Sequence, residues 1–300
     1  MSQASLPSVD IQSVIYLNDP SEIVRGAEFS ANSARFARSE GLLGDWRLVL
    51  GDCSPEPVLS ADDQQAIRDH VEKAGGVLSY RHFGKNLGSA AGHNALAEGG
   101  DSRLIVILNP DALMAFDTLS SLLGAMDENV GIVESRQIPV EHPKDFEEAT
   151  GDTSWASTAC ALTSRKVFDE VGGFDSETFF LYCDDVDYSW RLRIAGYRVR
   201  FEPAARLFHD KRLTSSADWP ASSAEVYYSA EAALLLAHKY SRDDLVESLL
   251  AQLDLDRDSG VIRAVAEYRR RVATNTTPAQ IDADHSVAEF VNGNYAVHRF

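Results

Sequence analysis

The sequence has few cysteines, a deficit of basic residues and no long apolar run. Its three cysteines, Cys53, Cys160 and Cys183, lie far apart and do not form the close pairs of a zinc site, so we expect reduced thiols, as in a cytoplasmic protein. Lys and Arg number 28 against 46 Asp and Glu, which gives a net charge of −18 and disfavours nucleic acid as a partner. No apolar stretch reaches membrane-spanning length, and residues 1–9 lack the layout of a signal peptide.

The chain is long and apolar enough for a substantial core. It has 300 residues, of which 44% are hydrophobic, and this size fits one large α/β domain with an appendage. Short apolar runs alternate with helical patterns up to about residue 135, which indicates a mainly parallel sheet with helices on both faces. The predicted strands are 13–17, 46–50, 77–80, 104–108 and 130–134, and the predicted helices follow Asp19 and span 61–74, 87–98 and 115–126.

The second half of the chain is less regular. Residues 137–154 predict a long loop, and long loops in compact domains are often lids over a binding site. The other predictions are a strand at 155–163, a helix at 165–171, a helix capped by Asp184 or Asp185, a strand at 197–201 before Pro203, and helices at 224–240, 243–253 and 261–272. We therefore expect a first domain at 1–220, and a helical region and tail at 221–300.

Polar side chains follow three of the predicted parallel strands. Asn18 and Asp19 end the first, Asp52 ends the second, and Asn109 and Asp111 end the strand at 104–108. Taken singly, Asp19 is more simply a helix cap and Asp52 a turn residue. Together they predict a ligand-binding edge, because ligands of open α/β sheets lie beyond the carboxyl ends of the strands. Asp111 is our candidate ligand for a metal bound to phosphates, since hard cations prefer oxygen.

Small residues fill the stretch from Asn86 to Asn94, which includes Gly88 and Gly92. Glycine permits another group to approach the backbone closely, and the first turn of a helix can bind a diphosphate through its N–H groups. Tight packing of the helix on the sheet selects the same residues, so the stretch supports both interpretations.

Three carboxylates lie within four residues at Asp184, Asp185 and Asp187, after the aromatic stretch at 179–182. Their mutual repulsion favours a helix N-terminus, a bound cation or a catalytic role, and a partly buried carboxylate is suited to act as a general base. A helix cap with solvated neighbours is the simpler alternative. Judged alone, His209 is an ordinary surface or core histidine, and Trp155 is a core residue.

In combination, these motifs resemble those of the family 2 glycosyltransferases of the GT-A fold, over residues 14–240. The Asn-Pro-Asp form at 109–111 points to the rhamnosyltransferase-like branch. The motifs are, in order, Asn86-Leu87-Gly88 with Ala91-Gly92-His93-Asn94, Leu108-Asn109-Pro110-Asp111, Gly172-Gly173-Phe174-Asp175, Phe179 through Asp187, Trp190-Arg191-Leu192-Arg193, Ala195-Gly196-Tyr197, and Pro203 with His209.

The resemblance implies an inverting transfer of a sugar from a dTDP- or UDP-sugar to an acceptor hydroxyl, on a glycan or a lipid-linked glycan. Asp185 would be the catalytic base, and Asp111 with His209 would bind Mn²⁺ or Mg²⁺. Asn109 stands where the family has a first metal-binding carboxylate. The acceptor contacts would be Trp155 and Asp184, and the donor contacts would be Asn18, Asp52, Asn86, Gly88, Asn94, Asn109 and Asp111.

Two alternatives from other classes stay open. A catalytically inactive, nucleotide-sugar-binding partner subunit is favoured by Asn109 and by the acidic charge. A nucleotidyltransferase ranks last, because no glycine-rich loop with a following lysine accompanies the first strand. The sequence leaves open whether the chain forms a homodimer. We expect a cytoplasmic enzyme that at most visits the inner face of the membrane.

Overall fold

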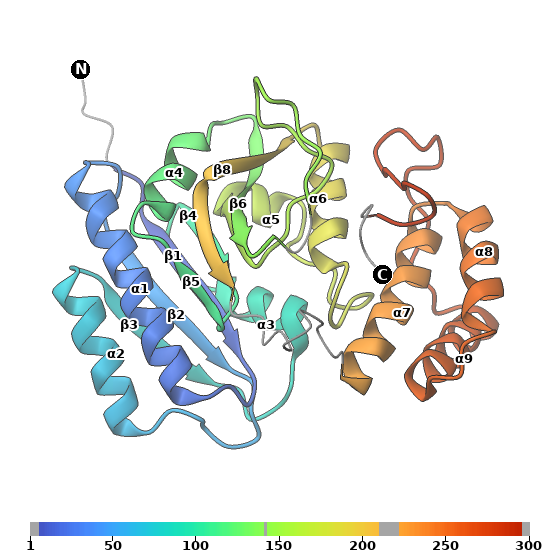
Figure 1. The fold of residues 1–300 in the computed structure, drawn as a ribbon, viewed down its shortest axis with the longest axis horizontal. Coiled ribbons are helices and arrows are strands. Elements are labelled where there is room, and N and C mark those ends of the chain that lie inside the picture. The colour runs from blue at the N-terminus through green and yellow to red at the C-terminus, as the bar shows by residue number, and fades with distance from the viewer. Residues whose placement is uncertain (1–5, 141–142, 210–221, 296–300) are drawn as a thin grey trace.

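A computed structural model describes residues 6–140, 143–209 and 222–295, and its centre is an eight-stranded sheet (Figure 1). The strands follow the order β3-β2-β1-β4-β7-β6-β8-β5 across this sheet. Their bounds are Val9–Ile15 (β1), Trp46–Asp52 (β2), Val77–His82 (β3), Leu104–Leu108 (β4), Ala112–Met114 (β5), Val130–Ile138 (β6), Cys160–Ser164 (β7) and Arg198–His209 (β8).

The first half of the sheet is parallel, as the sequence predicts. Strand β1 pairs in parallel with β2 and β4, and β2 pairs in parallel with β3. The second half is mixed, because β7 runs antiparallel to both β4 and β6, whereas β8 is parallel to β6. Because β7 is antiparallel to both of its neighbours, β4 and β6 run in the same direction, and β8 runs with them. The carboxyl ends of β4, β6 and β8 therefore meet at one edge of the sheet.

Helices cover both faces of the sheet, which confirms the predicted α/β architecture (Figure 1). The apolar run of β4 explains this arrangement, because Val106 and Leu108 face one core, whereas Ile105 and Ile107 face the other. The first core packs under α1 (Pro20–Ser39), α2 (Ala61–Lys73) and α4 (Thr118–Ala125), and the second under α3 (Gly88–Ala97), α5 (Arg165–Glu170) and α6 (Asp184–Ile194).

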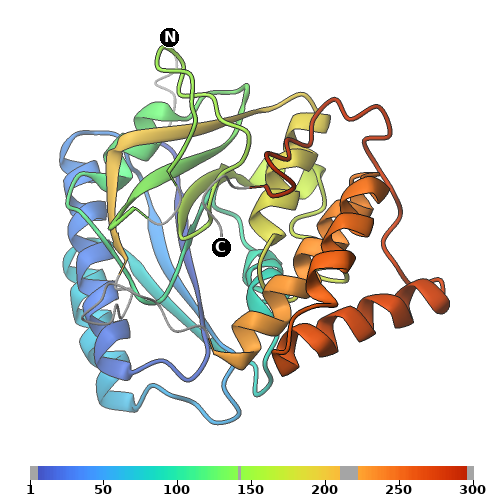
Figure 2. The same ribbon diagram turned by 45° about the vertical axis from the view of Figure 1, so that its right-hand side comes forward.

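Three C-terminal helices, α7 (Ser223–Lys239), α8 (Asp243–Leu253) and α9 (Ser259–Ala273), lie beyond α6 on the side away from α1 and α2 (Figures 1 and 2). Their apolar core is shared with the first part of the chain, because Trp190 of α6 packs against Tyr240 and Phe290. The boundary that we predicted at residue 220 lies outside the described residues.

Several predicted elements differ from the structure. The short strand β5 was missed, and β6 continues through Gln137, which we had placed in a loop. Strand β8 does not stop before Pro203. Instead the register with β6 shifts from Ser135–Glu202 to Arg136–Arg206, because the bulge accommodates a proline that has no N–H to pair.

Part of the loop predicted as a lid, residues 146–153, lies beside the beginning of β8. Phe146 and Thr153 form a bridge, Asp152 bridges to Arg200, and the N–H of Thr153 bonds to the carbonyl of Val199. These contacts hold the segment against the beginning of β8, at the opposite end of that strand from His209. The backbone bonds therefore hold residues 146–153 away from the edge where the strands end, whereas Gln137 contacts His209 and Lys144 lies within range of the charge of Asp185. That the segment closes over an acceptor stays a prediction.

Cys53, Cys160 and Cys183 are free and buried, which agrees with the predicted thiols. Across the parts of the chain that the structure describes, no helix combines the length and the hydropathy needed to span a bilayer.

Candidate active site

A pocket of about 290 Å³ opens at the edge where β1 and β4 end, between these strands and the start of α3. Four of the predicted donor contacts line it, namely Asn18, Asn86, Gly88 and Asn109. We call it the β1–α3 pocket. Its remaining lining includes Tyr16, Ser89, His93 and Phe180, which our sequence analysis did not name as donor contacts.

Gly88 is required by its position at the start of α3. Its φ is +71°, and a Cβ there would collide with the carbonyl oxygen and the ring of Phe180. The N–H of Gly88 already bonds to Asn86 Oδ1 and that of Ser89 to the Phe180 carbonyl, at 3.0 and 3.1 Å. These two donors are therefore occupied, and the predicted use of this helix N-terminus for a diphosphate does not hold for them.

His93 adds an uncharged wall to the β1–α3 pocket. Burial lowers the pKa of its imidazole to about 4, so the ring is neutral at physiological pH. A neutral ring at this position adds no positive charge to the pocket.

Three polar residues from distant parts of the chain meet beside this pocket. His209, the last residue of β8, places Nε2 3.2 Å from Asp111 Oδ1 and 3.4 Å from Asn109 Nδ2. The two strands β4 and β8 end at the same edge, which brings together residues 98 and 100 positions apart. This is the juxtaposition that the family resemblance implied.

The hydrogen bonds of Gln137 determine how His209 is oriented. Gln137 Nε2 donates to Ser157 Oγ, so its Oε1 faces His209 Nδ1 at 3.0 Å and accepts the ring proton. Nε2 then faces the Asp111 carboxylate. In the neutral tautomer its lone pair would be available to a divalent cation between the two side chains, with the ring held from behind by Gln137.

The protein would bind that cation with only a few side chains. Within the described residues, no cluster of three or more His, Cys, Asp or Glu side chains is placed to bind a metal. Asp111 and His209 would therefore hold Mn²⁺ or Mg²⁺ together with oxygen atoms of a bound phosphate, as is common for Mg²⁺.

Asp185 lies in the first turn of α6, four residues after Leu181 of the pocket lining, and its charge acts on the buried Glu134 and Lys144. Helix α6 follows Phe180 and Leu181, which line the β1–α3 pocket, and it has Cys183 as its N-cap. Neither Asp184 nor Asp185 is the cap that we predicted. Tyr182 and Cys183 have φ values of +66° and +57°, so two consecutive non-glycine residues take the left-handed conformation just before the helix.

Asp184 is buried, although we predicted that it contacts an acceptor. Only 4% of its surface is exposed, and burial together with the charge of Asp185 raises its pKa to about 7. The side chain of Ser89, which lines the β1–α3 pocket, lies near this carboxylate and opposes the rise of its pKa. Asp184 thus links α6 to the pocket wall from the inside.

Trp155, the other predicted acceptor contact, is covered on a face and an edge. Lys144 Nζ lies 3.1 Å from the centre of its ring, the Tyr295 ring stands edge-on at 5.5 Å, and 5% of the residue is exposed. Both acceptor candidates are therefore inside the protein, and Trp155 is covered by Lys144 and by the Tyr295 ring.

Asp52 and Asn94 also have internal roles. Asp52 is fully buried and accepts bonds from Tyr80 Oη at 2.6 Å and from the N–H groups of Ser54 and Val58. Burial alone would raise its pKa, but these donors outweigh burial and lower it. Asn94 pairs with both backbone groups of Phe174, at 2.8 and 2.9 Å. Neither side chain reaches the β1–α3 pocket.

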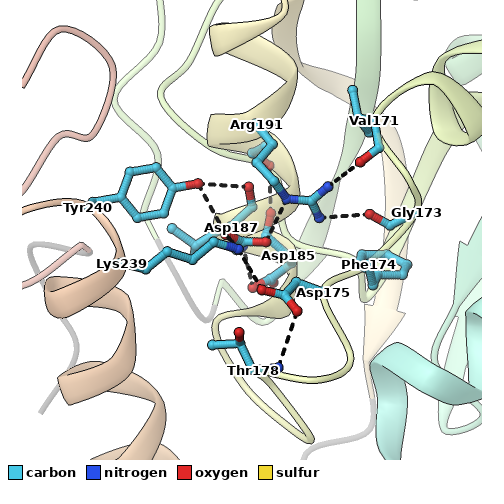
Figure 3. Close-up of polar contacts among 12 residues, drawn as sticks. Val171, Gly173, Phe174, Asp175, Thr178, Asp185, Asp187, Arg191, Lys239 and Tyr240 are labelled. Atoms are coloured by element: carbon cyan, nitrogen blue, oxygen red, sulfur yellow. Dashed lines mark hydrogen bonds and ion pairs between the residues drawn. The ribbon is translucent and has the colours of Figure 1, made fainter. Parts of the chain in front are cut away.

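A buried charge network joins α6 to the end of α7 (Figure 3). Lys239 Nζ lies 2.6 Å from Asp187 Oδ1 and 2.7 Å from Asp175 Oδ2. Arg191 Nε bonds to the other oxygen of Asp187, and the Tyr240 hydroxyl donates to Oδ1. Our sequence analysis missed this network, because a lysine is usually exposed and no local pattern marks a buried one.

No protein-family model matches the sequence. An N-acetylglucosaminyl-diphospho-decaprenol L-rhamnosyltransferase of Mycobacterium tuberculosis is 35% identical over 129 residues, which are 42% of this chain and 41% of that protein. A pre-mycofactocin glycosyltransferase of the same organism is 31% identical over 208 residues, or 63% and 42% of the two chains. The chain thus spans about two fifths of the length of these curated relatives.

Solved structures share the fold over most of the chain. A mannosyltransferase of Pyrobaculum calidifontis in complex with GDP-Man and Mn²⁺ has a TM-score of 0.53 and 17% identity, covering 91% of this chain and 84% of that one. GalNAc-T7 with UDP, GalNAc and Mn²⁺ has a TM-score of 0.60 and 10% identity, covering 91% and 56%. The chain therefore has the fold of the GT-A glycosyltransferases, and part of its sequence is similar to those of rhamnosyltransferases and other glycosyltransferases.

Proposed function

We propose that the protein transfers a sugar from a UDP- or dTDP-sugar to an acceptor hydroxyl, with inversion at the anomeric carbon. One observation carries the proposal. Asp111 and His209 converge beside the β1–α3 pocket, and the far wall of that pocket leads directly into the helix that bears Asp185.

Asp185 is the proposed base. In the reaction, the acceptor oxygen forms a bond to the anomeric carbon while the bond from that carbon to the diphosphate breaks, and Asp185 accepts the hydroxyl proton. Its position in the first turn of α6 supports this role, because the positive end of the helix dipole favours an ionised carboxylate that is ready to take a proton.

Asp111 and His209 would hold the divalent cation, which would offset the negative charge of the departing diphosphate. Gln137 fixes the imidazole so that its lone pair faces this position, and Asn109 extends the polar edge toward the β1–α3 pocket. Asn18, Asn86 and Asn109 would contact the donor from the pocket walls.

The acceptor that we propose is a glycan or a lipid-linked glycan. The name of one relative places its acceptor sugar on a diphospho-decaprenol carrier, and that name supports the lipid-linked class here. An enzyme with such an acceptor would work at the inner face of the membrane.

The test has a binding arm and a transfer arm. Titration with UDP, dTDP and GDP, each with and without Mn²⁺, should show metal-dependent binding of one nucleotide. Asp185→Asn should bind that nucleotide as the wild type does and lose at least about 100-fold in transfer rate, the usual contribution of a general base. Asp169→Asn, an exposed acid of α5, is the control. Transfer by Asp185→Asn at the wild-type rate would contradict the assignment.

An inactive nucleotide-sugar-binding subunit is the second candidate. It is favoured by Asn109, which replaces a carboxylate at the metal edge, and by Asp52, which is fully engaged inside the protein. Metal-dependent nucleotide binding without transfer or donor hydrolysis, across a panel of acceptors, would support this candidate over the enzyme.

A further inference from the structure

Lys239 is a charged residue in the interior of the protein. It ends α7, and only 7% of its side chain is exposed. A buried ammonium is costly unless it is paired, and Lys239 has two carboxylate partners at 2.6 and 2.7 Å and the ring of Phe179 5.5 Å away. Such close pairing fixes the positions of all the groups involved.

Both partners of Lys239 belong to the stretch that forms the proposed active site. Asp187 lies in the first turn of α6, two residues after Asp185, and both are drawn in Figure 3. Asp175 begins the segment that runs through Phe180 to the N-cap of α6, and it also accepts the N–H of Thr178. One ammonium thus ties the two ends of residues 175–187 together.

This stretch has little regular structure of its own to hold it. Between Asp175 and α6 it has no helix or strand, and it includes the left-handed pair Tyr182 and Cys183. Helix α3 contacts it through the bond from the Ser89 N–H to the Phe180 carbonyl. Helix α7 contacts it from another element, where the Tyr182 hydroxyl donates to Glu225 at 3.2 Å and the rings of Phe180 and Tyr228 stack with their centroids 4.8 Å apart. The C-terminal helix therefore forms the backing of the stretch that lines the β1–α3 pocket.

We propose that Lys239 is a positioning residue for sugar transfer, and that it sets the place of Asp185 and Phe180 through its ion pairs with Asp187 and Asp175. The C-terminal helices are then part of the catalytic unit. Lys239 touches no substrate in this proposal. The expected effect on kcat rests on the proposed function, whereas the expected effect on residues 175–187 rests on the geometry alone.

Lys239→Met removes the charge and keeps the length of the side chain. We expect faster hydrogen exchange in residues 175–187, a loss of at least tenfold in kcat, and little change in the affinity for the UDP or dTDP that the wild type binds with Mn²⁺. Lys239→Arg restores a cation that can pair with both carboxylates, so it should recover part of the kcat and of the protection.

A matched control separates positioning from stability. Arg271→Met breaks the ion pairs of Arg271 with Glu231 and Glu267 within the C-terminal helices and touches neither α6 nor the 175–187 stretch. It should lower the thermal midpoint without raising exchange in residues 175–187 or changing kcat. Equal kinetic losses in both variants at equal stability would overturn the proposal.

Two further outcomes are decisive. Wild-type exchange and kcat in a folded Lys239→Met would refute the role of Lys239. If that variant does not fold, Tyr240→Phe, which removes only the hydroxyl bond to Asp187, should still raise exchange in the first turn of α6, and its failure to do so would refute the coupling. If the wild type transfers no sugar, the proposed function fails while the exchange arm still decides whether Lys239 holds the stretch.

Discussion

Lys144 and Glu134 form an ion pair inside the protein, with Nζ and Oε2 3.0 Å apart and 4% of each side chain exposed. The same ammonium donates to the carbonyl of Trp155 at 3.0 Å and lies over its ring. Burial raises the pKa of Glu134 to about 7, and the nearby ammonium opposes this rise. Lys144 is therefore the residue that fastens the segment beginning at 143 to β6 and to Trp155.

Removing one partner of this pair should be much more costly than removing both. Lys144→Met leaves Glu134 buried without its counter-charge, and we expect a loss of about 3–5 kcal/mol in the free energy of unfolding. The double variant Lys144→Met/Glu134→Leu should recover most of that loss. Urea denaturation measures both, with the exposed Lys166→Met as the control. A loss of unfolding free energy in the double variant equal to the sum of the losses in the two single variants would contradict a coupled pair.

The orientation of His209 by Gln137 should matter for the metal. Gln137→Leu removes the acceptor for the Nδ1 proton, and we expect Mn²⁺-dependent nucleotide binding to weaken about 10–100-fold, as it does when a partner behind a metal-binding histidine is lost. Asp111→Ala should abolish the Mn²⁺ dependence. Gln252→Leu, on the exposed side of α8, serves as the reference. An unchanged Mn²⁺ titration in Gln137→Leu would remove Gln137 from this role.

Asp184 should make stability depend on pH. Its ordinary pKa is 3.8, and burial raises the value to about 7 in the folded protein. Between these values the folded state holds a proton that the unfolded state has released, so the free energy of unfolding falls as the pH rises. Relative to Asp184→Asn, the wild type should lose up to about 1.4 kcal/mol per pH unit. Urea denaturation from pH 4 to pH 8 tests this. If the unfolding free energies of the wild type and Asp184→Asn change with pH in parallel, the prediction is refuted.

The hydroxyl of Tyr80 should stabilise the fold through Asp52. Tyr80→Phe removes one of the donors to a fully buried carboxylate, which should cost about 1.5–3 kcal/mol, the range for bonds to charged groups. Tyr197→Phe removes a similar bond to Glu170 at the surface and should have a much smaller effect. Thermal unfolding of the two variants compares them directly, and equal shifts would argue against burial as the cause.

The sequence predicted the parts of the fold that depend on local pattern. The strand at 104–108 has the predicted bounds, since an apolar run ended by Asn-Pro-Asp allows little else. The meeting of Asp111 with His209 was implied by the family resemblance and not by the local pattern, since the predicted strand ended before Pro203. Pro203 misled the prediction of β8, because a bulge that depends on the partner strand is invisible in the strand itself.

The errors at the site have a common physical origin. Trp155, Asp184, Asp52 and Asn94 are polar or amphipathic residues near the correct edge, and only tertiary packing determines whether such a side chain faces a ligand or the interior. Segments distant in sequence cover two of them, with Tyr295 against Trp155 and Phe174 against Asn94. No local pattern indicates which distant segment will pack over a given residue.

The three buried thiols can report local unfolding of the regions that contain them. Burial raises the pKa of Cys53 and Cys160, so neither sulfur is a reactive thiolate in the folded state. Cys160 belongs to the core of the sheet, whereas Cys183 packs between α6 and the C-terminal helices. A thiol-alkylating reagent would consequently modify each sulfur only when its own region opens, and the order of modification would rank the local stabilities of the two cores without any introduced label.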